Sequence, residues 1–493
     1  MLLLYIIIAY FALLLGIAYY TSRDSTNHDF FIGGRNSNWF LVAFGMIGTS
    51  LSGVTFISVP GTVEKAHFTY FLVVLGYFLG YLVVAYVLLP LYYRLNLTSI
   101  YNYLDNRFGV NAYKTGALFF ILSRTLGATL RLYLVINVLQ LFILDNLGIS
   151  FYITTFFILG MILLYTFKGG VKSIVWTDTL QTTFMLLGLF VCLGYVKAEL
   201  GLSVADLWSK LNEKGYTDMF IYDVHDKKFF LKQILGGMFV TITMTGLDQE
   251  MMQKNISVRT LAGAQKNMLL FSSVMVVVNL AFLVLGGTLY LYAAQLNLSV
   301  TGDDLFPTVA LQHLPYWVSV IFIVGLISAL FPSADGAITA LTSSFCIDIL
   351  NIERRLGASE ASQRALRQRV HLSFTALFLV CIVVFKWIND KSIISLILDI
   401  ASYTYGPLLG LFAFGILTRR VVQDRFVPFV CIAAPVFCYF LTNSVNIDGF
   451  KFGSQLLFMN IFGNYKFGLE LLFINGLLTF LGLWAISSRR KDI

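Results

Sequence analysis

The chain has 493 residues, of which 58% are hydrophobic and 12% are charged, and its formal net charge is +8. An average soluble domain is roughly a quarter charged, so this composition excludes an ordinary soluble protein. The basic excess does not indicate a nucleic-acid partner, because the basic residues are spread over loops between apolar segments.

About thirteen apolar segments follow one another along the chain, most of them close to the ~20 residues that cross a hydrocarbon core of roughly 30 Å. They cover residues 2–20, 39–61, 69–93, 114–143, 149–167, 174–197, 231–252, 267–294, 314–349, 370–387, 393–417, 425–441 and 467–487. Backbone amides in lipid must be satisfied within their own segment. We therefore predict an all-α membrane protein with about 13 transmembrane helices.

The loops between these segments alternate between rich and poor in basic residues. One set of alternate loops holds most of them, including Lys254, Arg259 and Lys266 after the seventh segment. Cytoplasmic loops carry the positive excess. We therefore predict an N-terminus outside and a C-terminus inside, in a multi-pass protein of the cell (plasma or inner) membrane.

Two segments carry the glycine, proline and hydroxyl residues that are typical of a helix broken near the midplane of the membrane. They are 39–61, with Gly48 and Pro60, and 231–252, with Gly246. Close helix packing is another use of glycine, and it stays open for either segment. Their interval favours one membrane domain, 1–493, with two inverted five-helix repeats. We place an extra N-terminal helix at 1–22, the repeats at 38–200 and 231–420, and C-terminal helices at 425–493.

Ionisable side chains inside apolar segments are costly and mark a functional site by default. The clearest are Arg124, Arg131, Asp178, Asp248, Glu250 and Asp335. Asp178 either belongs to a site or faces the dipole of its helix. Arg131 either pairs with one of the acids or holds an anionic group. We interpret Asp248 and Glu250 as helix-end and gating groups.

Asp335 lies in a hydroxyl-rich segment that we expect to be interrupted at Pro332. Hard cations prefer oxygen ligands, and a carboxylate, hydroxyls and carbonyls freed at a break would supply them. Serine and threonine can also bond to their own helix. The pattern favours an ion site near Asp335.

Several longer motifs make the chain resemble the sodium:solute symporter family over nearly its whole length. They are SLSGVTFISVPG from Ser50, KGGVKSIVWTDTLQT around Asp178, GLDQEMMQKNIS around Asp248, FPSADGAITALTSSFCIDI ending at Ile349 and YGPLLGLFAFGILTRR near Gly410. The resemblance implies a LeuT-type fold of five-plus-five inverted repeats. It also implies alternating access with Na+ as the coupling ion.

The resemblance further implies two sodium sites. The first would use the carbonyls of Gly48, Leu51 and Ala329 and the hydroxyl of Ser333; the chain departs at Pro332, where the family has a serine ligand. The second would use Asp178 with Ser333, Asp335 and Gly336. Asp335 either replaces the missing hydroxyls, binds a proton or pairs with Arg131.

For the solute, the resemblance points to five residues. Ser52 and Thr55 match hydroxyls that hold a carboxylate in sialic acid carriers, and Arg131 lies where those carriers place an arginine. Met244 and Thr245 stand where glucose-type members keep aromatic residues, which disfavours glucose.

We therefore expect sodium-coupled symport of a small polar solute, such as a sugar, sialic acid or a carboxylate. The alternative is a proton-coupled or uncoupled carrier or channel of the same fold. No histidine or cysteine cluster suggests catalysis, so we expect no enzyme activity. The expected partners are the solute, Na+ and the lipid bilayer, with no nucleic acid, and the protein is expected to function as a monomer.

Overall fold

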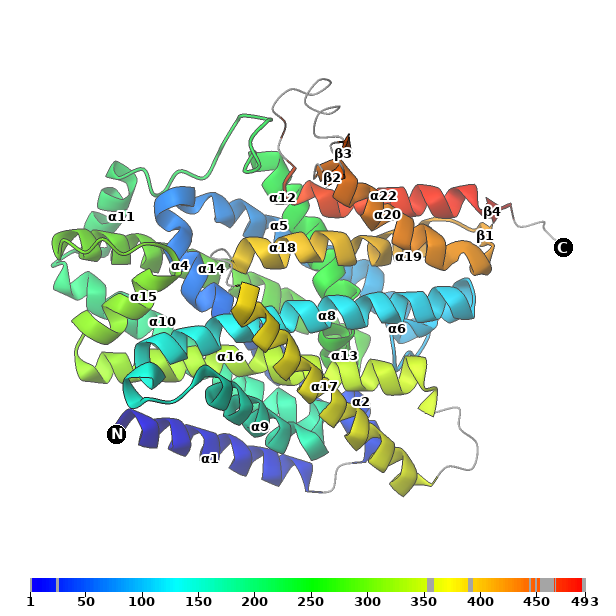
Figure 1. The fold of residues 1–493 in the computed structure, drawn as a ribbon, viewed down its shortest axis with the longest axis horizontal. Coiled ribbons are helices and arrows are strands. Elements are labelled where there is room, and N and C mark those ends of the chain that lie inside the picture. The colour runs from blue at the N-terminus through cyan, green and yellow to red at the C-terminus, as the bar shows by residue number, and fades with distance from the viewer. Residues whose placement is uncertain are drawn as a thin grey trace.

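A computed structural model describes residues 2–23, 26–352, 359–388, 393–442, 445–447, 450–452, 465 and 467–489, and helices make up nearly all of it. Long helices lie side by side, and α17 crosses them at an angle (Figure 1). The α-helices are α1 (Leu2–Ser22), α2 (Asn27–Ile32), α3 (Trp39–Ser50), α4 (Gly53–Ala66), α5 (Tyr70–Val83), α6 (Leu89–Arg94), α7 (Asn102–Arg107), α8 (Val110–Leu139), α9 (Phe151–Gly169), α10 (Val171–Glu199), α11 (Val204–Glu213), α12 (Phe230–Thr241), α13 (Gln249–Ile256), α14 (Leu261–Gln295), α15 (Leu305–Thr308), α16 (Tyr316–Ser344), α17 (Glu360–Ile388), α18 (Ile393–Thr404), α19 (Gly406–Leu417), α20 (Val427–Thr442) and α22 (Glu470–Ala485).

Short turns and strands complete the described chain. The 3-10 and π turns are η1 (Gly33–Arg35), η2 (His67–Thr69), η3 (Val84–Leu88), η4 (Gln140–Leu144), η5 (Asp145–Leu147), η6 (Ile242–Gly246), η7 (Gly302–Asp304), η8 (Val309–His313), η9 (Phe345–Ile349) and η11 (Asp424–Phe426). The strands β1 (Val421–Val422) and β4 (Ser487–Ser488) pair antiparallel, as do β2 (Val445–Ile447) and β3 (Phe450–Phe452).

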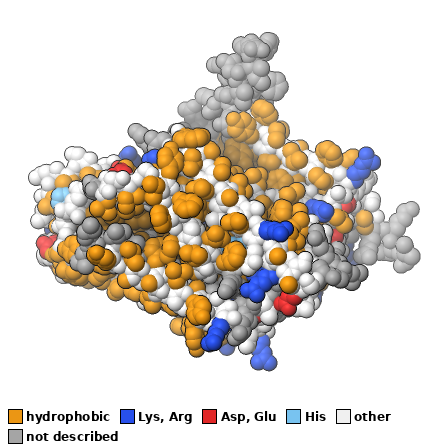
Figure 2. Space-filling view, turned by 60° about the horizontal axis from the view of Figure 1, so that its bottom comes forward, with side chains coloured by type: hydrophobic (Ala, Val, Ile, Leu, Met, Phe, Trp, Pro, Cys, Tyr) orange, Lys and Arg blue, Asp and Glu red, His pale blue; other side chains and the backbone are white. Residues whose placement is uncertain are grey.

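Many helices are long and apolar enough to cross a membrane. Among the described residues there are 7 such segments, and the bent pair Phe230–Gly246 and Gln249–Ile256 makes up to 8. Shorter apolar helices include Trp39–Ser50, Phe151–Phe167 and Glu470–Ala485. On the face drawn in Figure 2, apolar side chains cover a large part of the surface, and the basic side chains gather toward the right and the bottom. The all-α membrane fold is confirmed, whereas the number of about thirteen crossings stays a prediction.

The first predicted break lies where the sequence placed it. Helix α3 ends at Ser50 and α4 begins at Gly53, while Leu51 (φ −83°, ψ 76°) and Ser52 (φ −73°, ψ 173°) leave the helical conformation. Gly48 sits one turn before the break, at a close approach to α10 where an added Cβ would collide with the hydroxyl of Thr182. The Leu51 N–H still donates to Ile47 O and Ser52 O accepts from the Phe56 N–H, so the groups that leave the helical pattern are the Leu51 carbonyl and the Ser52 N–H.

The second predicted break lies between η6 and α13, whose axes differ in direction by 64° across it. Tyrosines from other helices take up the carbonyls that this bend frees: Tyr92 Oη donates to Gly246 O at 2.8 Å, and Tyr101 Oη donates to Leu247 O at 2.9 Å. Asp248 caps α13 by accepting from the backbone N–H of Glu250 at 3.0 Å. These partners for the Gly246 and Leu247 carbonyls and the Glu250 N–H stabilise the bend in an apolar surrounding.

The predicted interruption at Pro332 is wrong, because α16 runs as a helix from Tyr316 through Pro332 to Ser344. Proline removes one N–H donor and crowds the carbonyl four residues earlier, but neighbouring helices can compensate for this in a membrane bundle. Helix α16 is packed on several sides, against α3, α8, α10 and α17. Asp335 consequently lies on a continuous helix.

Two glycines allow α5 and α12 to pack with their backbones in contact. An added Cβ at Gly76 would collide with Ile234 O, and one at Gly237 would collide with Val73 O. Small residues permit this approach in membrane proteins, where packing contributes much of the helix association. This contact holds α12 against α5. Because α12 continues through η6 to the second break, the contact also fixes the position of that break.

We predict that Gly237→Ala destabilises the protein by about 1–3 kcal/mol, the usual cost of overfilling a packed interior, because the backbone of Val73 must move. The matched control is Gly194→Ala, where nothing lies within 4 Å of an added Cβ. Alanine raises helix propensity there, so that variant should be neutral or slightly stabilised. Thermal unfolding in detergent measures both, and equal melting temperatures would contradict the contact.

Candidate functional site

A polar cavity of ≈ 120 Å³ lies between the two breaks. Its walls come from α3, α4, α5, α8, α12, η6, α13, α14 and α18. It is lined by Thr49, Ser50, Ser52, Val54, Thr55, Tyr70, Tyr77, Tyr81, Arg124, Arg131, Val240, Thr241, Met244, Thr245, Met251, Met275, Asn279 and Ile397. The structure thus brings all five residues predicted for the solute, namely Ser52, Thr55, Arg131, Met244 and Thr245, to one cavity.

The start of α4 forms part of this wall. Ser52 is the N-cap residue, and its hydroxyl makes no capping hydrogen bond to the helix, while Val54 and Thr55 of the first turn also line the cavity. The first N–H groups of a helix lack partners within it and carry a partial positive charge. This end of α4 therefore favours an anionic or hydrogen-bond-accepting group.

Two arginines one heptad apart on α8 have different surroundings. Arg124 is 4% exposed and forms an ion pair with Glu250, and its Nη1 lies 3.7 Å from Asp248 Oδ2. Arg131 is half-buried on the cavity wall, and no ion pair or hydrogen bond joins it to another residue in the described part of the chain. Of the alternatives left open for Arg131, the structure does not show the internal ion pair.

Asp248 and Glu250 are not merely helix-end groups. Asp248 does cap α13, as that interpretation requires, but it also accepts a hydrogen bond from Tyr405 Oη at 2.8 Å. Both acids are buried, with exposed fractions of 0% and 1%, and both lie against Arg124. They hold the bend of the second broken helix to α8.

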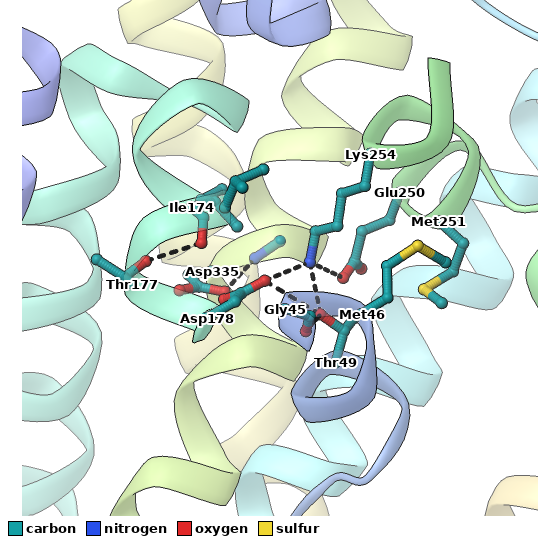
Figure 3. A network of polar contacts seen from close by, with 12 residues as sticks. Gly45, Met46, Thr49, Ile174, Thr177, Asp178, Glu250, Met251, Lys254 and Asp335 are labelled. Atoms are coloured by element: carbon teal, nitrogen blue, oxygen red, sulfur yellow. Dashed lines mark hydrogen bonds and ion pairs between the residues drawn. The ribbon is translucent and has the colours of Figure 1, made fainter. Parts of the chain in front are cut away.

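Lys254 is the residue that the sequence interpretation missed. We expected it in a cytoplasmic loop, but it lies on α13 with 2% exposure, and its Nζ is 2.7 Å from Asp178 Oδ2 and 2.6 Å from Thr49 Oγ1 (Figure 3). The error arose because the sequence from Gln253 onwards, after the apolar segment 231–252, has the polar composition of a loop. The spacing of Glu250 and Lys254, four residues apart on one helix face, was the available signal.

Asp178 joins three helices at this cluster. It stands on α10, its Oδ2 accepts from Lys254 and from Thr49 Oγ1 at 3.2 Å, and an added Cβ at Gly45 of α3 would press against its own Cβ. Its Oδ1 is buried and has no hydrogen-bond partner. The alternative in which Asp178 only faces the dipole of α10 does not account for the ion pair.

Asp335 does not pair with Arg131 in the described structure. Its Oδ2 accepts from Tyr165 Oη at 2.7 Å and its Oδ1 from the Gly336 N–H at 2.5 Å. Figure 3 shows its carboxylate beside that of Asp178. Two of the three roles considered for Asp335, as an ion ligand or as a proton acceptor, therefore remain as predictions.

The other predicted sodium ligands lie on two helices that pack together, α3 and α16. Gly48 and Leu51 are at the end of α3, and Ala329 and Ser333 are buried in the middle of α16. Ser333 Oγ donates to Leu330 O at 3.0 Å, so its lone pairs stay available. No three His, Cys, Asp or Glu residues of the described chain converge as a metal site. The residues predicted for the first site offer carbonyl and hydroxyl oxygens, whereas Asp178 and Asp335, predicted for the second, offer carboxylates.

Comparisons with known proteins agree with this architecture. The model of the sodium:solute symporter family matches residues 30–424. The chain is 23% identical to a sodium/sialic acid symporter of Aliivibrio fischeri over 82% of its own length and 80% of that protein. It is 25% identical to sodium-coupled monocarboxylate transporter 1 of Mus musculus, over 80% of this chain and 65% of that protein.

Two further matches extend the comparison. The chain is 30% identical to the Homo sapiens sodium/iodide cotransporter, over 47% of this chain and 36% of that protein. The structure of a Na+-coupled sialic acid symporter, in a substrate-bound outward-open state, superimposes with a TM-score of 0.82 at 18% identity, covering 99% of each chain.

The two broken helices and the cavity between them belong to a LeuT-type fold, which the sialic acid symporter structure shares. The chain belongs to the sodium:solute symporter family. It is a multi-pass membrane protein that carries a small solute together with sodium ions, and it is not an enzyme.

We predict that Arg124→Met destabilises the protein by about 3–5 kcal/mol, because it leaves the buried Asp248 without its cation and Glu250 with only the Lys254 ammonium at 3.7 Å. Arg131→Met is the matched control on the same helix, and it should cost much less because Arg131 makes no ion pair in the described structure. Thermal unfolding in detergent compares the two. Equal losses would contradict the division of roles between the arginines.

Proposed function

We propose that the solute of this sodium symporter is a small anion, bound with its negative group between Arg131 and the start of α4. The observation that carries this proposal is the charge of the cavity wall. Two arginines and no aspartate or glutamate are among its described lining residues. Arg124 is neutralised by Glu250 and Asp248, so Arg131 provides the positive charge that faces the solute.

Neighbouring groups can complete the recognition of such an anion. Ser52 and Thr55 offer hydroxyl donors beside the first N–H groups of α4, and half-helix N-termini bind substrate carboxylates in transporters with broken helices. Arginine and carboxylate form strong charge-assisted hydrogen bonds. Met244 and Thr245 present no aromatic ring on the η6 wall of the cavity, and the three tyrosines that line it, Tyr70, Tyr77 and Tyr81, all come from α5.

Three of the relatives transport solutes of the same charge. Sialic acid, monocarboxylates and iodide are all anions at neutral pH, and they are the solutes named for the relatives in Aliivibrio fischeri, Mus musculus and Homo sapiens. The shared feature is negative charge rather than size or shape. This favours an anion without deciding which one.

For sodium, we propose the carbonyls of Gly48, Leu51 and Ala329 with the hydroxyl of Ser333 as the first site. The packing of α3 on α16 supports this site. It has one hydroxyl ligand fewer than the family pattern, because Pro332 stands where the family has a serine. For the second site we propose Asp178 and Asp335, whose carboxylates lie beside each other (Figure 3). The unpartnered Oδ1 of Asp178 supports this pair.

The topology is also a proposal. We place the N-terminus outside and the C-terminus inside from the distribution of basic loop residues, with inverted repeats at 38–200 and 231–420. The first helix of each repeat would be one of the two broken helices, with its break at Leu51–Ser52 or at Leu247–Asp248. We further propose that one chain suffices for transport, since the cavity and both proposed ion sites lie within it.

Arg131→Met should lower uptake of the anionic solute about 10- to 100-fold at limiting concentration, because a hydrogen bond to a charged group contributes roughly 1.5–3 kcal/mol. The measurement is uptake into proteoliposomes under an inward sodium gradient. The panel is a set of monocarboxylates, sialic acids, neutral sugars and zwitterionic amino acids. Arg364→Met, at an exposed position of α17, is the control and should leave uptake unchanged.

The result that would overturn the proposal is sodium-driven uptake of a neutral sugar that persists in Arg131→Met. Uptake that ignores the sodium gradient would contradict coupling itself and favour an uncoupled carrier. These two outcomes are separate, because one concerns the solute and the other concerns the ion.

Ser333→Ala should raise the sodium concentration for half-maximal uptake about fivefold, the equivalent of roughly 1 kcal/mol. The hydroxyl is the only side-chain ligand proposed for the first site. Ser319→Ala on the same helix is the control, since Ser319 Oγ bonds to Ala310 O far from the site. An unchanged sodium requirement in Ser333→Ala would remove this residue from the site.

A further inference from the structure

The Lys254 ammonium is surrounded by side-chain oxygen atoms. It lies 2.7 Å from Asp178 Oδ2, 2.6 Å from Thr49 Oγ1 and 3.7 Å from Glu250 Oε1. Three different helices, α10, α3 and α13, supply these oxygens. A carboxylate and a hydroxyl that converge in an apolar interior also suit a hard monovalent cation.

The surrounding charge is not balanced. The ion pairs of this region join three carboxylates, Asp178, Asp248 and Glu250, to two cations, Arg124 and Lys254. When Arg131, on the same helix and cavity wall as Arg124, and Asp335, beside Asp178, are counted as well, four carboxylates stand against three cations. In addition, Asp178 Oδ1 is buried without a hydrogen-bond partner. The cluster therefore favours one more cation.

We propose that Lys254 is a tethered competitor of sodium: its ammonium holds the place of a cation on Asp178, and sodium binds Asp178 fully only when Lys254 moves away. This inference rests on the proposed function, in which Asp178 belongs to the second sodium site. Lys254 is not among the predicted sodium ligands, and in this inference it sets the affinity of the second site for sodium.

The lysine has a second position available without unfolding its helix. Glu250 lies one turn earlier on α13, and its Oε1 has no hydrogen-bond partner, although its Oε2 is held by Arg124. A small rotation of the side chain would transfer the ammonium from Asp178 to Glu250. Both positions pair the buried charge, so the exchange avoids the cost of an uncompensated ion.

The position of Lys254 links this exchange to the bend. Lys254 belongs to α13, directly after the break at Leu247–Asp248, while its partner oxygens on Thr49 and Asp178 lie on α3 and α10. A shift of α13 would draw the ammonium away from the site. Sodium on Asp178 would thus favour the arrangement of α13 in which Lys254 pairs with Glu250.

The test is Lys254→Met in the full-length protein, reconstituted in proteoliposomes. The sodium concentration for half-maximal solute uptake should fall about tenfold or more, because the competing cation is gone while Asp178 remains. Lys266→Met, at an exposed position at the start of α14, is the matched control and should leave this concentration unchanged. An unchanged or raised sodium requirement in Lys254→Met overturns the inference.

Because Lys254→Met leaves Asp178 without its ion-pair partner, this variant is expected to need sodium in order to fold. A second variant therefore tests the competition without removing the charge. Lys254→Arg retains the positive charge and should keep the sodium requirement at or above that of the wild type. A fall equal to that predicted for the methionine variant would overturn the competition. The double variant Lys254→Met with Asp178→Asn should lose the gain in sodium affinity, since the shared acceptor is altered.

The outcomes separate this inference from the proposed function. Sodium-dependent uptake in the wild type with no shift in Lys254→Met removes the competition but leaves the symport and its anion site intact. Uptake of the anion that ignores sodium in every variant contradicts both.

Discussion

The structure depends on one constraint: a charge or a free backbone group in the middle of a membrane protein must find a partner inside the protein. Two helices are broken near the centre of this fold, and buried ionisable residues cluster beside the breaks. Asp248, Glu250 and Arg124 connect the second break to α8, and Lys254 connects α13 to Asp178 on α10. The broken helices are therefore held by ion pairs as well as by packing.

The two breaks differ in whether their backbone groups have hydrogen-bond partners within the protein. At the second break, Tyr92 and Tyr101 donate to the freed carbonyls of Gly246 and Leu247. At the first break, the N-cap Ser52 makes no capping bond and the start of α4 faces the cavity. Groups that the protein leaves unsatisfied at the first break are available to a solute or an ion.

Much of this could be predicted from the sequence, because burial in lipid leaves strong patterns. The glycine-rich segments located both breaks, and motif resemblance placed Ser52, Thr55, Arg131, Met244 and Thr245 in what proved to be one cavity. Pro332 misled because sequence alone does not show whether neighbouring helices support a proline within α16. Lys254 was misplaced because its counter-ion, Asp178, is 76 residues away along the chain. Pairings over such distances are set by the tertiary fold.

Two regions of the protein are proposed to bind ions of opposite charge: Arg131 binds the anionic group of the solute, and the cluster around Asp178 binds cations. A cryo-EM structure of the protein with saturating sodium and a transported anion tests this most directly. The account predicts the anionic group within hydrogen-bond distance of Arg131 and the start of α4, with density for an ion at Asp178 and the Lys254 ammonium turned to Glu250. An anion bound away from Arg131, with Lys254 still on Asp178 and no ion beside it, would contradict the account.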